Sequence, residues 1–145
     1  MNGFLGLCLL ICCALPSLRA LCQPQAVTPQ PEAQSHESKA TIEGPVRAVA
    51  CPIQNLEATA THLSMKCLVA CARKGSPLVI LTKDGELYLP ISDKMPDTDQ
   101  RPRLMPFLGK YVQVGGTVYE RRGTHAIAID EIKELKDVYL TIEDP

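Results

Sequence analysis

The stretch Lys110-Tyr-Val-Gln-Val-Gly-Gly-Thr-Val-Tyr119 decides the fold that we expect for this chain. Its valines alternate with other residues, which places them on one face of a β-strand. The adjacent Gly115 and Gly116 indicate a bulge or a sharp coil in that strand. A turn through residues 120–123 leads into Thr124-His-Ala-Ile-Ala-Ile-Asp130, where two isoleucines again share one face. These residues therefore predict two long, strongly coiled neighbouring strands.

Three further strands are expected before this pair. Residues 44–51 combine small and β-branched side chains and end at Pro52, which has no amide hydrogen to donate. Residues 77–82 and 86–91 flank Asp84-Gly85, a pair that suits the positive φ of a tight hairpin turn. Five strands with one helix fit a closed or partly closed barrel better than a flat sheet. The last two strands resemble those of many OB-fold domains, and we expect a mainly β, five-stranded OB-like barrel.

One helix is expected between the first two strands. Thr61 is a suitable N-cap, Arg73-Lys74 suits the negative end of a helix dipole, and Gly75 suits the left-handed position beyond it. These signals predict a helix of three to four turns. The helix of the usual OB fold comes later in the chain, so this position departs from the usual topology. Residues 92–105 are polar and proline-containing and are predicted to form a loop.

The amino-terminal part of the chain has the features of a targeting segment followed by a linker. Residues 4–18 are nearly all apolar, which is the length of a signal-peptide core and short for a membrane span. We expect residues 1–22 to be a signal peptide and the protein to be secreted or periplasmic. Membrane attachment would require a lipid on Cys22, which the preceding Leu21 disfavours. Residues 23–43 have almost nothing to bury and predict a flexible, disordered tether, which leaves 44–140 for the barrel.

The composition of the chain and the motifs that it lacks narrow the range of possible functions. The 145 residues suffice for one domain, and 15 basic against 16 acidic residues give no positive surplus for binding nucleic acid. Aromatic residues are 4% of the chain and Trp is absent, which makes stacking surfaces for bases scarce. The sequence contains no nucleophile elbow, phosphate loop or His-Glu-x-x-His motif. We therefore expect a non-enzymatic binding or accessory domain that acts with a protein partner of unknown identity.

Three cysteines of the predicted domain carry the remaining functional signal. Cys67 and Cys71 are one turn apart on the expected helix, with Cβ atoms about 5–6 Å apart, too far for a disulfide without distortion. Cys51, at the end of the first expected strand, is predicted to reach them. With His62 at the helix start, the three sulfurs would match the ligands of tetrahedral zinc, and soft ligands also suit Cu(I). The sequence thus predicts a zinc or copper site formed by Cys51, His62, Cys67 and Cys71.

Two other interpretations use the same cysteines. In the first, the protein is thiol–disulfide active, and Cys67 or Cys71 exchanges with Cys51. In the second, the protein is a structural interaction module whose cysteines only bridge or pack. A bridge from Cys51 to one helix cysteine would then be a staple worth about 2–4 kcal/mol. Packing would use the apolar stripe of Leu63, Cys67, Ala70 and Cys71, in which cysteine acts as a small hydrophobic residue.

The pattern also resembles uncharacterised small domains of exported bacterial proteins. The residues that carry this resemblance are Cys51, His62, Met65-Lys-Cys67, Cys71-Ala-Arg-Lys-Gly75-Ser-Pro77, Gly85-x-Leu-Tyr-Leu89 and Gly109-Lys-x-Val-x-Val-x-Gly116. It covers residues 44–135, almost the whole expected barrel. It implies an OB-like fold and export, and it implies no catalytic residue.

Overall fold

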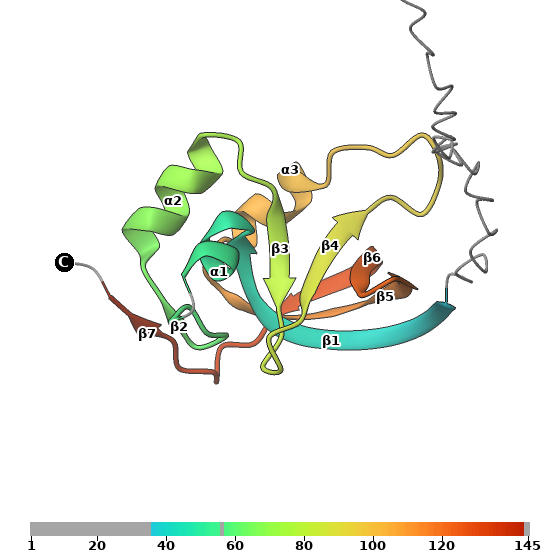
Figure 1. Ribbon diagram of the computed structural model, residues 1–145. Coiled ribbons are helices and arrows are strands. Elements are labelled where there is room, and N and C mark those ends of the chain that lie inside the picture. The colour runs from blue at the N-terminus through green and yellow to red at the C-terminus, as the bar shows by residue number, and fades with distance from the viewer. Residues whose placement is uncertain (1–35, 56, 144–145) are drawn as a thin grey trace, which may run out of the picture. The chain divides into compact units, whose positions relative to one another are not determined.

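A computed structural model of the protein describes residues 36–55 and 57–143, and it forms a closed β-barrel (Figure 1). The barrel strands, in the order in which they neighbour one another, are β1 (His36–Ala48), β3 (Leu78–Leu81), β4 (Leu87–Ile91), β6 (Thr124–Glu134) and β5 (Tyr111–Arg121). β5 pairs with β1 to close the barrel. Among the barrel strands, β4 and β6 run parallel to each other, and the other neighbours are antiparallel. The predicted small OB-like barrel is thereby confirmed.

The first strand begins earlier and ends earlier than the sequence predicted. β1 pairs with β5 from His36, opposite Glu120, to Pro45, opposite Tyr111. Ile42 of this strand is 7% exposed and belongs to the core. The prediction of a tether to residue 43 is therefore wrong for residues 36–43, because the long β5 supplies a partner for a polar strand. The predicted signal peptide and residues 23–35 lie outside the described residues.

The turns and the bulge follow the sequence. Gly85 has a φ of +86° in the turn between β3 and β4. The register of β5 against β6 shifts between Gly115 and Gly116, as the paired glycines predicted. A Cβ on Gly116 would lie 2.2 Å from the carbonyl oxygen of Ala128, so the two strands approach each other too closely there for any side chain.

The helices differ from the prediction in number and position. Within residues 36–55 and 57–143 the helical segments are α1 (Ala50–Gln54), α2 (Met65–Arg73), α3 (Arg101–Leu104) and the 3₁₀ turn η1 (Met105–Phe107). α2 is the expected helix, but it starts after Ser64, whose side chain accepts a hydrogen bond from the Cys67 amide at 3.3 Å. Thr61 lies outside it. α3 and η1 occupy part of the segment predicted to be a loop.

A second, two-stranded sheet lies beside α2 in Figure 1. β2 (His62–Leu63) pairs in parallel with β7 (Thr141–Ile142). His62 therefore belongs to a strand, because its backbone is held by the carboxyl-terminal segment of the barrel domain. The amide of Thr141 donates to the carbonyl oxygen of Thr61 at 2.7 Å.

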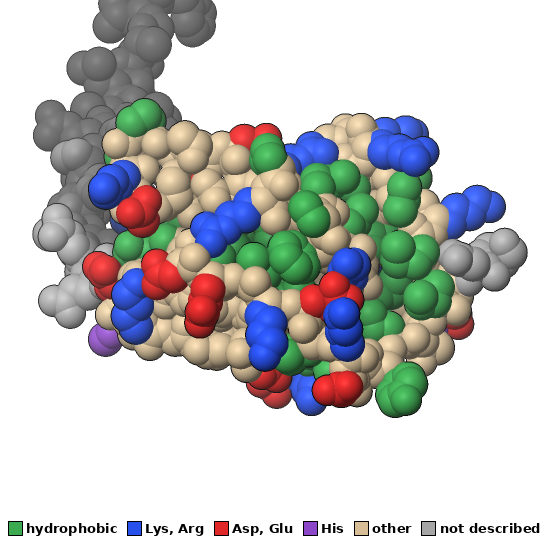
Figure 2. All heavy atoms as spheres, turned by 180° about the vertical axis from the view of Figure 1, so that it is seen from behind, with side chains coloured by type: hydrophobic (Ala, Val, Ile, Leu, Met, Phe, Trp, Pro, Cys, Tyr) green, Lys and Arg blue, Asp and Glu red, His purple; other side chains and the backbone are tan. Residues whose placement is uncertain are grey.

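The barrel interior is aliphatic and the surface carries mixed charge. Among the largest fully buried side chains are Val46, Ile80, Val112 and Ile127, which come from four different strands. On the face seen from behind, acidic and basic side chains are intermingled (Figure 2). No helix within the described part of the chain is long and apolar enough to cross a membrane.

Candidate metal centre

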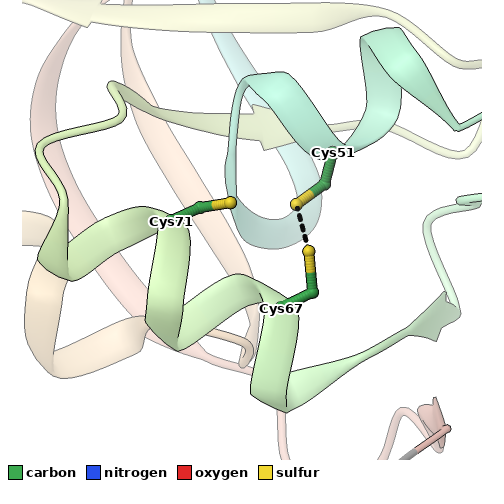
Figure 3. Close-up of side chains that lie close together, drawn as sticks. All are labelled: Cys51, Cys67 and Cys71. Carbon is green, nitrogen blue, oxygen red and sulfur yellow. Dashed lines mark hydrogen bonds between the residues drawn. The ribbon is translucent and has the colours of Figure 1, made fainter.

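The three cysteines of the barrel domain come together between two helices. Cys51 lies on α1, whereas Cys67 and Cys71 lie one turn apart on α2 and point toward it (Figure 3). The expected placement of Cys51 at a strand end is wrong, because β1 ends at Ala48 and the chain turns directly into α1. Pro52 is tolerated in the first turn of this helix, where an amide hydrogen is not needed. The predicted meeting of the three cysteines is nevertheless what the structure has.

The sulfur atoms have spacings that suit a shared ion. The three Sγ atoms all lie within 4.8 Å of one another, and those of Cys51 and Cys67 are 3.6 Å apart. Tetrahedral zinc with bonds of about 2.3 Å holds its sulfurs about 3.8 Å apart. A disulfide bond is about 2.05 Å long, and all three thiols are free. The described residues therefore contain a three-sulfur cluster and no disulfide bond.

The environment of Cys51 favours its neutral thiol. Burial, followed by the hydrogen bond with Cys67, raises the pKa of Cys51 to about 12. The neighbouring Cys71 adds to this shift, since nearby thiolates would repel one another. In the absence of a cation, Cys51 is therefore protonated at neutral pH. A bound cation would have to displace that proton.

Arg47 is a member of this site that sequence reasoning missed. It lies near the end of β1, is 2% exposed, and lines the same pocket as the three cysteines. Its Nη1 donates to the carbonyl oxygens of Thr59 at 2.9 Å and His62 at 3.1 Å, while its Nε has no partner. The signal for it was a lone arginine in an otherwise small and apolar strand segment, four residues before Cys51.

His62 lies near the cysteines without joining them. It lines the same pocket, but its Nε2 is 2.9 Å from Oε1 of Glu143, and the three-sulfur cluster does not include it. No sequence motif points to Glu143, which follows the last expected strand by many residues. The role of His62 as a fourth ligand stays a prediction, and because Glu143 engages Nε2, the nitrogen left for an ion is Nδ1.

The pocket beside the sulfurs gives access to them. It has a volume of about 210 Å³ and lies between α1, α2 and β2. Small and polar side chains such as Ala50, Gln54, Asn55 and Ser64 line it together with the cysteines. Cys67 is exposed, and Cys51 and Cys71 are half-buried. The cluster can therefore be reached by an ion or a small ligand.

Comparisons with known proteins add no functional information: no protein-family model, curated protein or solved structure matches this chain.

Proposed function

We propose that this protein is an exported, non-enzymatic binding or accessory domain that holds a soft metal ion, zinc or copper, through Cys51, Cys67 and Cys71. The observation that carries the proposal is the convergence of three free sulfurs within 4.8 Å of one another. They come from two helices whose positions are fixed by the barrel, so the ligand set is formed by the fold.

The chemistry of the donors supports a soft ion. Thiolates select zinc or Cu(I) over the hard cations Ca²⁺ and Mg²⁺, which prefer oxygen ligands. Three protein ligands leave a fourth position on zinc, which His62 or a molecule in the pocket would fill. Export of the protein, which the sequence predicts, also supports a bound ion at this site. Outside the cytoplasm closely spaced free thiols tend to oxidise, and a bound ion protects them.

Metal analysis of the purified protein tests the proposal. We expect about one zinc or copper ion per chain after purification without chelator, and loss of that ion when Cys67→Ser and Cys71→Ser are combined. Cd²⁺ added to the metal-free protein should produce sulfur-to-metal charge-transfer absorption that the double variant lacks. Ala70→Ser is the matched control, because it adds a hydroxyl to an exposed position of the same helix.

The same measurement can overturn the proposal. Equal metal content in the wild type and the double variant would show that the ion is bound elsewhere. Binding should also raise the free energy of unfolding by about 2.7 kcal/mol when the free ion is at 100 times its dissociation constant. A Cys-dependent signal without any such stabilisation would indicate binding to unfolded chains.

The distance of 3.6 Å between the Sγ atoms of Cys51 and Cys67 favours a second candidate function, thiol–disulfide exchange. In that reaction one thiolate attacks a partner's disulfide, and the other cysteine then displaces the partner's thiol. The raised pKa of Cys51 makes its thiolate scarce, which slows any attack by this residue. Metal binding is the better supported function, because a third sulfur converges on this pair, which an exchanging pair does not need.

Cys71→Ser separates the two candidates. It removes one of the three metal ligands but leaves the Cys51–Cys67 pair intact. If the protein binds metal, this variant should lose affinity for Cd²⁺. If it exchanges disulfides, the variant should keep a pair of thiols whose oxidation follows the applied redox potential.

A further inference from the structure

Arg47 has no carboxylate partner, although it is almost fully buried. Its hydrogen bonds go to two backbone carbonyl oxygens, and none of the described carboxylates lies within ion-pair distance of its guanidinium. Burial without a counter-ion disfavours the charged guanidinium and lowers the pKa of Arg47. A charge held at such a cost calls for a compensating negative charge nearby.

Glu57 and Glu143 also line this pocket, but Cys51 and Cys67 are the groups whose negative charge acts on Arg47. Strand alternation turns Arg47 away from the barrel core that Val46 enters, and toward the segment that carries α1. When they are ionised, Cys51 and Cys67 raise the pKa of Arg47, whereas burial lowers it. Arg47 is thus placed in the pocket of the three cysteines, where it would interact with thiolates.

We infer that Arg47 is the built-in counter-charge of the metal site, a positioning residue that binds no metal itself but stabilises the loaded state. The inference rests on the proposed function. A divalent ion with three thiolates carries one net negative charge, which the guanidinium cancels. In the empty site none of the described carboxylates forms an ion pair with the same guanidinium. Arg47 therefore favours the loaded state over the empty one.

A pair of substitutions isolates the charge. Arg47→Lys and Arg47→Gln both lose the Nη1 group that donates to the two carbonyl oxygens, but only lysine keeps a positive charge. Zn²⁺ affinity is measured for the full chain by competition with a chelator. We expect Arg47→Gln to bind Zn²⁺ about 10–100-fold more weakly than the wild type, the range for residues that support metal ligands. Arg47→Lys should bind at least tenfold more tightly than Arg47→Gln.

Stability of the metal-free protein is the second readout. We expect metal-free Arg47→Gln to be at least as stable as metal-free Arg47→Lys, and the order to reverse in the presence of Zn²⁺. Arg121→Gln is the control, because this residue is exposed in β5 and it should change neither quantity. A residue that only tied down the loop at Thr59 and His62 would not produce such a reversal.

The results with the Arg47 variants distinguish failure of the counter-charge inference from failure of the proposed metal binding. Equal Zn²⁺ affinity of Arg47→Lys and Arg47→Gln, in a protein whose binding depends on Cys67 and Cys71, would overturn the inference and leave the proposed function standing. Absence of Cys-dependent binding in the wild type would overturn both. If Arg47→Gln does not fold, Arg47→Met replaces it, since methionine fills a similar volume without a polar group.

Discussion

At the scale of single residues, the cysteine cluster differs from a set of packed apolar side chains in its electrostatics. A thiol that packs as a hydrophobic residue needs no neighbour of its own kind. Here two further sulfurs and a buried guanidinium share one pocket with Cys51. Burial and the hydrogen bond with Cys67 both raise the pKa of Cys51, so that this thiol keeps its proton. A cation that binds these sulfurs would therefore have to displace the proton of Cys51, so that metal binding is coupled to proton release.

That coupling predicts the pH dependence of metal binding. Because the pKa of Cys51 is raised to about 12, the empty site holds this proton throughout the neutral range, and the loaded site does not. The logarithm of the Zn²⁺ affinity should therefore rise by at least about one for each pH unit between about pH 6 and about pH 8. Competition titrations at several pH values measure the slope. An affinity that stayed constant over this range would show that Cys51 is not a ligand.

At the scale of elements, the start of α2 is set by the residue that caps its amino terminus. The sequence predicted Thr61 as the N-cap of this helix. The structure uses Ser64, because residues 62 and 63 are held in β2 by their pairing with β7. The capped amide belongs to Cys67, so the same contact that starts the helix orients a proposed ligand.

This assignment is tested by removing each hydroxyl in turn. Ser64→Ala should lower the free energy of unfolding by about 1 kcal/mol, because it leaves helix amides without a cap. Thr61→Ala should have an effect of less than about 0.5 kcal/mol, as is usual for exposed positions. Urea denaturation of both variants and the wild type gives the comparison. A larger loss for Thr61→Ala would place the start of the helix where the sequence alone suggested.

At the scale of the whole molecule, the barrel extends further toward the amino terminus than the predicted domain. Residues 36–43 add to β1 a segment that runs along β5 and helps to close the barrel. Exposed Thr41 and Glu43 alternate with buried Ile42, which is the pattern of a strand with one face in the core. The domain therefore includes residues that composition alone assigned to the tether.

Ile42→Ala tests this extent of the domain. A residue in a tether would tolerate the change, whereas a core isoleucine should lose about 2–5 kcal/mol of stability. Ile53→Ala is the matched control, since Ile53 is 60% exposed and should lose less than about 1 kcal/mol. Thermal and denaturant unfolding measure both. Comparable losses for the two variants would contradict the position of Ile42 in the core.

The sequence by itself determined the features that depend on neighbouring residues. Alternating valines and isoleucines predicted the strands, Asp84-Gly85 the hairpin turn, and Gly115-Gly116 the bulge, because period and φ preferences are local properties. The spacing of Cys67 and Cys71 placed both on one helix face for the same reason. These local signals were enough to predict the OB-like barrel.

The tertiary structure alone decided which distant residues meet. It extended β1 to His36 because β5 was long enough to pair with it, and it held His62 in a strand beside Glu143. It also buried Arg47 in the pocket of the three cysteines, a position that no local pattern reveals. Burial and long-range pairing are set by the closure of the barrel, which brings together segments that are far apart along the chain.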